Sequence, residues 1–286
     1  MATQKYTLNE LELIANNIRK DIIKMLETAG SGHSAGPLGL TDIFTVLYFD
    51  VLKHDPKNPK WDERDILVLS NGHCAPVLYA TLAESGYYDK KELYTLRHFG
   101  SRLQGHPERT KLPGVETTSG PLGSGLSQAI GMALAMRLNK QYHRWIYTVV
   151  GDGELNEGNV WEAAMLASKY KLNNVIGIID RNNIQLDGPT ESVMPLEDLK
   201  LKWEAFGWHV IEIDGNNIEA IIDACIMARA IVEKPVMIIA YTVPGKGVSF
   251  MEYDFHWHGA PPNHKQAKDA LHQLRTLQGR IRSEHE

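Results

Sequence analysis

The stretch that decides the fold is Gly151-Asp152-Gly153-Glu154-Leu155-Asn156-Glu157-Gly158, and a second polar stretch, Asp180-Arg181-Asn182-Asn183-Ile184, follows about thirty residues later. Each comes directly after an apolar, β-branched run that predicts a buried strand, over 145–150 and 174–180. The residues between them, about 159–172, predict a helix. Strand, helix and strand make a βαβ unit, whose strands run parallel with a right-handed crossover.

The two polar stretches together predict a metal site. Neighbouring parallel strands end at the same edge of a sheet, about 4.8 Å apart, so Asp152 and Asn182 can reach one ion. Glycines on both sides of Asp152 let the backbone turn sharply and approach a ligand closely. Oxygen ligands suit Mg2+ or Ca2+, and Ile184 can add a backbone carbonyl. The competing interpretation is a surface turn and an Asn-rich loop that share this spacing by chance.

Gly-Asp-Gly followed about thirty residues later by Asn, just past an apolar strand, resembles the thiamine diphosphate motif. In that family the Asp, the Asn and a nearby backbone carbonyl hold a divalent ion, and the ion holds the diphosphate. The resemblance therefore implies thiamine diphosphate as cofactor, with Mg2+ or Ca2+ bound by Asp152, Asn182 and Ile184. The ion offsets the anionic diphosphate, which protein carboxylates alone would repel.

The composition of the 286-residue chain, 43% hydrophobic and 23% charged, is that of an ordinary globular protein. A net charge of −5 implies no basic face for nucleic acid. Cys74 and Cys225 form neither a disulfide framework nor a zinc pattern, and they fit a reducing cytosol. The N-terminus lacks an apolar targeting segment and no run approaches the ~20 apolar residues of a membrane span, so we expect a cytoplasmic protein without membrane contact.

Helices and strands alternate along the rest of the chain. Further strands are predicted over 65–70, 209–213 and 235–241, and helices over 7–29, 40–52, 75–85, 90–97, 126–140, 195–206, 218–233 and 263–282. Five strands among helices predict a single α/β domain over residues 1–286, with three α/β/α layers and a mostly parallel sheet. In helix 126–140, Gly131 costs about 0.5–1 kcal/mol relative to alanine. We therefore expect a backbone or cofactor to approach it, although a tolerated core glycine explains it equally well.

Four of the twelve histidines, His33, His73, His106 and His258, stand in loops that contain Gly or Pro. Such loops carry function on rigid scaffolds, and imidazoles exchange protons near neutral pH and bind hydroxyl groups. A zinc site is the competing interpretation, because His256 and His258 form a His-x-His pair. No cysteines accompany that pair and no HExxH motif occurs, which argues against zinc.

These loops narrow the resemblance to transketolase, because six motifs occur in that family's order over nearly the whole chain. The motifs are Ser31-Gly32-His33 with Gly36-Pro37-Leu38-Gly39, Leu69-Ser70-Asn71-Gly72-His73, Gly105-His106-Pro107-Glu108, Thr118-Ser119-Gly120-Pro121-Leu122-Gly123, Gly151-Asp152-Gly153 and Trp257-His258-Gly259. The resemblance implies the family's thiamine diphosphate-binding fold. It also implies transfer of a two-carbon ketol unit from a ketose phosphate to an aldose.

The resemblance implies a role for each matching residue. His33, His106 and His258 would face the sugar and act as catalytic residues. The implied cofactor contacts come from His73, Gly120, Pro121, Leu122, Gly153, Glu157, Asn182 and His258. Among these, Glu157 matches an acidic residue that the family places at the contact between subunits.

One departure from the family pattern concerns the missing half of the site. A full transketolase continues with a second α/β domain and a third, smaller domain, whereas this chain stops near Glu286. In the family the glutamate that activates the aminopyrimidine lies in the second domain. We therefore expect the N-terminal subunit of a split transketolase, active only with a C-terminal subunit in an α2β2 heterotetramer. A truncated fragment would have the same sequence.

Two other classes of protein remain as alternatives. Another thiamine diphosphate enzyme, such as the α subunit of a 2-oxoacid dehydrogenase or a deoxyxylulose phosphate synthase, shares the Gly-Asp-Gly motif. We would not expect the His33 and His106 loops in this form there. A non-catalytic binding or regulatory homologue is the second alternative, and the retention of Asp152, Asn182 and all four histidines argues against it. The sequence leaves open the donor and acceptor sugars and the choice between Mg2+ and Ca2+.

Overall fold

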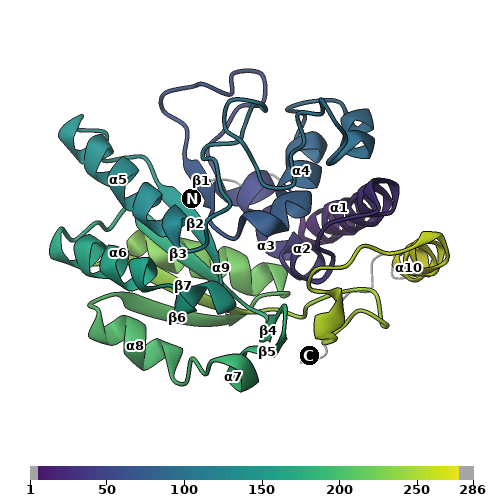
Figure 1. Cartoon of the computed structure of the whole chain (residues 1–286). Coiled ribbons are helices and arrows are strands. Elements are labelled where there is room, and N and C mark those ends of the chain that lie inside the picture. Colours follow the sequence, from purple (N-terminus) through teal and green to yellow (C-terminus); the bar gives the residue numbers. More distant parts are fainter. Residues whose placement is uncertain (1–5, 277–286) are drawn as a thin grey trace.

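The computed structural model, which describes residues 6–276, contains a five-stranded sheet in which every neighbouring pair is parallel (Figure 1). The strands are β1 (Ile66–Leu69), β2 (Ile146–Gly151), β3 (Val175–Arg181), β6 (His209–Asp214) and β7 (Val236–Tyr241), in the order β1-β2-β3-β7-β6. All five were predicted to within two residues at each end. Gly151 pairs with Asp180, so β2 and β3 end level with one another at one edge of the sheet.

Helices cover both faces of the sheet and confirm the three-layer prediction. One face packs against α5 (Ser124–Leu138), α6 (Gly158–Lys169) and α8 (Leu199–Ala205). The opposite core is formed with α1 (Leu8–Ala29), α3 (Thr41–Val46), α4 (Ala75–Glu84), α9 (Ile218–Ala230) and α10 (His264–Thr276). Successive residues of β2 alternate between the two cores, as the period of a strand requires. Both faces are therefore apolar, which explains the uninterrupted hydrophobic strands.

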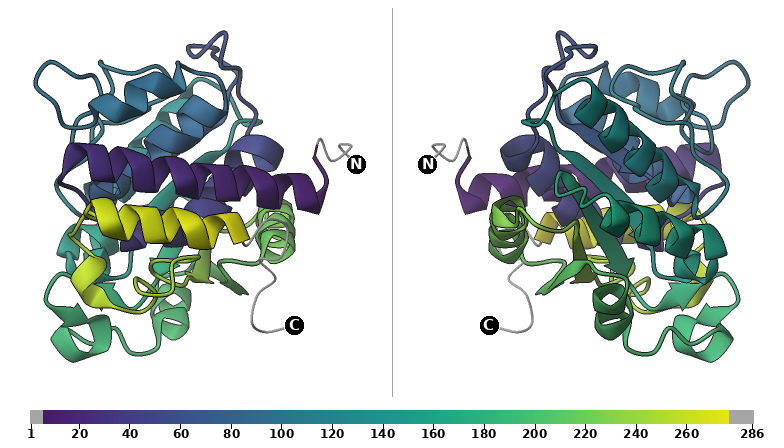
Figure 2. Two further views of the ribbon diagram at one scale, coloured as in Figure 1. Left: turned by 90° about the vertical axis from the view of Figure 1, so that its right-hand side faces the viewer. Right: turned by 90° about the vertical axis from the view of Figure 1, so that its left-hand side faces the viewer.

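Helices α1 and α10 lie side by side on the outer side of the second core (Figure 2). The Asn16 side chain of α1 is buried and donates a 3.0 Å hydrogen bond to the Leu274 carbonyl of α10. The last described helix is thus fixed to the first. The predicted helix over 263–282 is confirmed to residue 276, and its remainder lies outside the described residues. No helix among residues 6–276 combines the length and apolarity that crossing a bilayer requires.

Several short elements differ from the sequence prediction. The predicted loop 30–39 contains α2 (Ala35–Gly39), and the predicted helix 40–52 is α3 followed by a π-helical turn at Leu47–Val51. The predicted helix 195–206 is shorter in the structure, where only α8 is helical. The predicted helix 90–97 is a 3-10 helix at Lys90–Thr95. The structure also has unpredicted elements: β4 (Ile184–Gln185), β5 (Gly188–Pro189), α7 (Thr190–Val193) and 3-10 turns at Gly72–Cys74, Gly153–Asn156 and Phe255–Trp257.

Burial explains the unexpected helix α2. Its residues are all buried, and Pro37 stands in the first turn, where its missing N–H is tolerated. Packing against the core therefore outweighs the weak helix propensity of a glycine-rich segment.

The close backbone approach expected at Gly131 lies instead at Gly125, two turns earlier in α5. No described atom outside the helix's own backbone lies within 4 Å of a Cβ placed on Gly131, so residues 6–276 do not make the contact expected there. A Cβ on Gly125 would lie 2.5 Å from Oγ and 2.6 Å from Cα of Ser70. The beginning of α5 therefore touches the chain just beyond β1.

We expect Gly125→Ala to destabilise the chain by about 1–3 kcal/mol, because the new methyl group must displace the backbone of Ser70. The matched variant Gly131→Ala should instead stabilise it by about 0.5–1 kcal/mol, since its helix position is open. Urea unfolding of the isolated chain measures both free energies. A Gly125→Ala chain as stable as the wild type would contradict the packing described.

Candidate active site

The loops that follow β1, β2, β3 and β7 meet at one edge of the sheet and enclose a pocket of about 180 Å³. Seven of the residues predicted from the sequence line it: His73, Leu122, Asp152, Gly153, Asn182, Ile184 and His258. Parallel strands end at a common edge, and ligands of open α/β sheets bind there. The βαβ unit thus brings the two polar stretches together as expected.

Asp152 is buried at the floor of this pocket, and its carboxylate is held by three donors. Oδ1 accepts a 2.7 Å bond from the Gly153 amide. Oδ2 accepts a 2.7 Å bond from the Asn183 amide and a 3.0 Å bond from Nη1 of Arg181. Burial raises the pKa of Asp152, and the Arg181 charge and the hydrogen bonds oppose that rise. The carboxylate is therefore fixed in direction, and its loop is tied to the loop after β3.

Asn182 lies beside Asp152 and is held on both sides of its amide. Nδ2 donates a 2.7 Å bond to Asp180, and Oδ1 accepts a 3.0 Å bond from the Ile184 amide. Both Asn182 and Ile184 line the pocket with Asp152. The carboxylate, amide oxygen and backbone carbonyl of these three lining residues would make an oxygen-rich set suited to a hard divalent cation.

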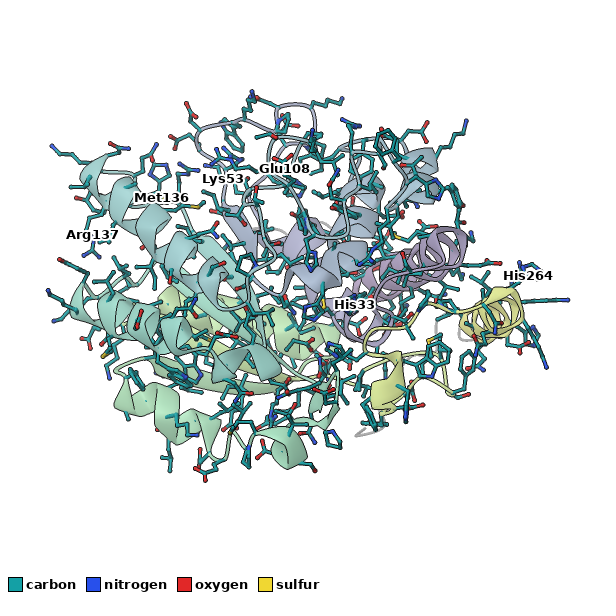
Figure 3. The ribbon with its side chains drawn as sticks, viewed as in Figure 1. His33, Lys53, Glu108, Met136, Arg137 and His264 are labelled. Carbon is teal, nitrogen blue, oxygen red and sulfur yellow. The ribbon has the colours of Figure 1, made fainter. Side chains whose placement is uncertain are left out.

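Three of the four singled-out histidines form a cluster. The ring centroid of His33 lies 5.0 Å from that of His73 and 5.7 Å from that of His258, and the His73–His258 distance is 5.2 Å. Nδ1 of His33 and of His258 is buried with no hydrogen-bond partner among the described residues. In Figure 3 His33 lies near the middle of the molecule, whereas His264 projects outward from α10. His73 and His258 line the pocket, whereas His33 does not and reaches it only through contact with those two rings.

The cluster is electrically neutral near pH 7. Burial, with smaller contributions from His258, Arg97 and His106, lowers the pKa of His33 to about 4. Burial also holds the pKa of His73 well below its usual value and lowers the pKa of His258. The pKa of His106 is lowered by burial and by the Arg97 charge. The charge of His106 also contributes to the lowered pKa values of His33 and His73.

His256, the other half of the His-x-His pair, does not join the cluster. Its Nδ1 bonds Asp254 at 2.7 Å, and its ring stacks on Phe255. Within residues 6–276 no group of three or more His, Cys, Asp or Glu side chains is arranged to hold a metal ion. The geometry of the described chain therefore gives the zinc interpretation no support.

The remaining predicted residues lie outside the pocket wall. Gly120 and Pro121 precede Leu122 in a loop that is joined to the His106 loop, because the Ser119 amide bonds the Pro107 carbonyl at 3.1 Å. Glu157 is exposed at the beginning of α6, beside Gly123. Pro121 and Glu157 are exposed and Gly120 is half-buried, and none of the three lines the pocket.

Comparison with known proteins agrees with this geometry. Residues 11–279 match the family model described as "Transketolase, thiamine diphosphate binding domain". The chain belongs to this family. It is 41% identical over 264 residues to a subunit of the apulose-4-phosphate transketolase of Phocaeicola vulgatus, with 92% of this chain and 93% of the relative covered. It is 43% identical over 265 residues to the 6-deoxy-6-sulfo-D-fructose transketolase subunit SqwG of Clostridium sp., with 93% and 96% covered.

Single-chain transketolases are similar to this chain over a part of their length. Transketolase 2 of Escherichia coli is 40% identical over 272 residues, which cover 91% of this chain and 41% of the relative. The crystal structure of transketolase from Campylobacter jejuni superposes with a TM-score of 0.88 at 39% identity, covering 94% of this chain and 43% of that one. The chain therefore spans about two fifths of the single-chain transketolases it matches.

Two buried acids of this transketolase domain were not recognised in the sequence. Asp180 bonds Thr242 Oγ1 and Nδ2 of Asn182, and burial raises its pKa to about 7. It orients the Asn182 amide and is itself part of the pocket lining. The sequence did contain a signal for this role, because Asp180 ends an apolar strand and stands two residues before the candidate ligand Asn182.

Glu154 is the second of these acids, and it joins three loops. One oxygen accepts hydrogen bonds from the Ser70 hydroxyl and, at 2.5 Å, from the Gly123 amide. The other accepts a 2.9 Å bond from the Gly151 amide. Burial raises the pKa of this carboxyl, and the hydrogen bonds oppose the rise. Glu154 therefore holds the end of β2 against the end of β1 and the beginning of α5.

We expect Glu154→Ala to destabilise the isolated chain by more than about 2 kcal/mol, because two buried donors and one part-buried donor lose their acceptor together. Its matched control is Glu157→Ala, which removes an exposed acid of the same loop and should change stability by less than about 0.5 kcal/mol. Urea unfolding provides both values. Equal effects of the two substitutions would show that Glu154 does not hold the loops together.

We expect the imidazole of His33 to titrate near pH 4 in the folded chain, compared with about 6.5 in an unfolded one. Between these values the unfolded chain binds a proton that the folded chain does not, so this group lowers stability as pH falls from 6.5 towards 4. Carbon-proton NMR of the histidine rings measures the pKa, and His33→Gln assigns the signal. A midpoint near 6.5 would contradict the buried position described.

Proposed function

We propose that this chain is the thiamine diphosphate-binding subunit of a two-subunit transketolase. It would transfer a two-carbon ketol unit from a ketose phosphate to an aldose or aldose phosphate. The observation that carries the proposal is the meeting of Asp152, Asn182 and Ile184 with His73 and His258 around one pocket. The relatives named above are transketolases, which favours ketol transfer over 2-oxoacid dehydrogenase or deoxyxylulose phosphate synthase chemistry.

The residues of the pocket fit the cofactor and its ion. Asp152, Asn182 and the Ile184 carbonyl offer oxygen ligands to Mg2+ or Ca2+. Gly153, His73 and His258 line the same pocket, and we infer that they would meet the diphosphate. Gly120, Pro121 and Leu122 would contact the aminopyrimidine side, because their loop borders the same cavity.

Bound thiamine diphosphate would supply the carbon nucleophile and electron sink that ketol transfer requires. The chain's own task is to bind the sugar and move its protons. His33, His106 and His258 are neutral near pH 7, so each ring nitrogen can accept a proton from a sugar hydroxyl and return it. A permanently charged imidazolium could not accept that proton.

The second half of the site would come from a C-terminal subunit that carries the activating glutamate, within an α2β2 assembly. Two relatives of nearly the same length are named as transketolase subunits, whereas the single-chain enzymes are more than twice as long. The exposed Glu157 would lie at the contact between subunits. Two buried free cysteines fit a cytoplasmic location.

We expect the purified chain to show negligible ketol transfer alone and full activity once the C-terminal subunit is added. In the reconstituted complex, Asp152→Ala should abolish activity that depends on thiamine diphosphate, because the ion loses its carboxylate. A coupled assay compares a ketose phosphate with a 2-oxoacid as donor. Full activity of the chain alone, or a preference for the 2-oxoacid, would refute the proposed function.

A further inference from the structure

Thr242 is a buried residue that directly follows the last residue of β7. Its hydroxyl donates a hydrogen bond to Oδ1 of Asp180. The other oxygen of that carboxylate, Oδ2, accepts a 2.7 Å bond from Nδ2 of Asn182. Asp180 and Asn182 line the pocket of about 180 Å³, whereas Thr242 does not. The candidate metal ligand Asn182 is therefore linked, through Asp180, to a hydroxyl that is not part of the pocket lining.

The direction of the Asn182 amide matters because its two ends have opposite hydrogen-bonding character. Oδ1 has lone pairs that can bind a cation, whereas Nδ2 can only donate. Asp180 accepts from Nδ2, and the Ile184 amide donates to Oδ1 at 3.0 Å. The Asp180 carboxylate thus holds the amide oxygen of Asn182 on the side away from itself. An Asp180 carboxyl that turned about its last bond would no longer impose this orientation.

The plane of the Asp180 carboxyl has to be fixed by its partners, because the last torsion of an aspartate side chain is broad and roughly two-fold. Asp180 is buried, and among residues 6–276 its side chain bonds Thr242 through one oxygen and Asn182 through the other. Of these two donors, Thr242 is the one that is not itself a candidate ligand. Without its hydroxyl, Asp180 and Asn182 could turn together.

Thr242 is itself held by tightly packed neighbours. A Cβ placed on Gly215 would lie 2.6 Å from Cγ2 of Thr242, so the methyl group packs against the backbone that follows β6. The next amide along the chain, of Val243, donates a 2.7 Å bond to Oδ1 of the buried Asn216. Nδ2 of Asn216 in turn donates a 2.8 Å bond to Asp42 of α3. The hydroxyl is therefore presented to Asp180 from a backbone that is fixed on its other side.

We propose that Thr242 is a positioning residue of the metal site: its hydroxyl orients Asp180, and Asp180 holds Asn182 with the amide oxygen toward the ion. The proposal deepens the proposed function and rests on it. Hydrogen-bond partners of metal ligands typically contribute about 10- to 100-fold in metal affinity. Within residues 6–276 no hydrogen bond joins Thr242 to the histidine cluster, so its removal should weaken the binding of the ion and leave the binding of the sugar nearly unchanged.

The first experiment measures metal affinity without catalysis. The complex with the C-terminal subunit is titrated with Mn2+ at saturating thiamine diphosphate, and electron paramagnetic resonance reports the free ion. Thr242→Val keeps the shape of the side chain without its hydroxyl and should raise the Kd for Mn2+ about 10- to 100-fold. Thr242→Ser keeps the donor and should raise it less than about threefold. The control Thr148→Val alters a buried threonine of β2 whose hydroxyl has no described partner, and should leave the Kd unchanged.

The second experiment separates metal binding from a general loss of structure. In Thr242→Val the Mg2+ concentration for half-maximal ketol transfer should rise about 10- to 100-fold, and KM for the ketose phosphate should change less than about twofold. An unchanged Kd for Mn2+ in Thr242→Val, or an equal rise in Thr242→Ser, would overturn the proposal. If urea unfolding shows that Thr242→Val does not fold, Thr242→Ala is judged by the same criteria. A wild-type complex that binds no Mn2+ with thiamine diphosphate would refute the proposed function and this proposal together.

Discussion

The site depends on one backbone contact, the 3.2 Å hydrogen bond from the Asp152 amide to the Asp180 carbonyl. It continues the parallel pairing of β2 and β3 one residue beyond the Gly151–Asp180 register. Because the two chains are still paired there, the loops that follow leave the sheet together. The Asn183 amide then bonds the Asp152 carboxylate, which fixes the second loop to the first. The candidate ligands therefore meet through main-chain geometry, before any ion is considered.

The charges around this contact favour a cation. Asp152 and Asp180 are both buried, their pKa values are raised by burial, and the Asp152 charge adds to the rise at Asp180. The Arg181 guanidinium offsets the negative charge of Asp152. Its Nη2 also donates a 2.6 Å hydrogen bond to Oε1 of Glu191. Buried carboxylates are costly without a counter-charge, and a divalent ion would supply it. Because the histidines that line the pocket are neutral, a diphosphate bound there would be attracted mainly to that ion.

The sequence predicted the parts of this arrangement that depend on local pattern. The βαβ unit around 151–182 follows from two apolar runs with a helix between them, and the loop positions of His33, His73 and His258 follow from glycine and strand ends. Strand pairing then brings these loops together without further information. This is why the fold class was predicted correctly, and why the loops that carry the candidate ligands meet at one edge of the sheet.

The sequence did not predict the residues that act through distant backbone groups. Glu154 bonds amides that lie 31 residues and 3 residues away, and a hydroxyl 84 residues away. No local period marks such a role. The contact predicted at Gly131 was wrong for a different reason. A glycine inside a helix costs the same free energy relative to alanine whether or not another group approaches it, so the cost alone does not reveal a contact. The close approach is at Gly125, which only the packing of α5 on the end of β1 reveals.

The most direct test of the account is to locate the ion. Crystals of the complex with its C-terminal subunit, grown with thiamine diphosphate and Mn2+, would give an anomalous scattering peak for the metal. The account predicts one peak within coordination distance of an Asp152 oxygen, Oδ1 of Asn182 and the Ile184 carbonyl, beside the diphosphate. A diphosphate bound with its metal elsewhere, or with Asp152 still bonded to Arg181 and no metal at that position, would contradict it.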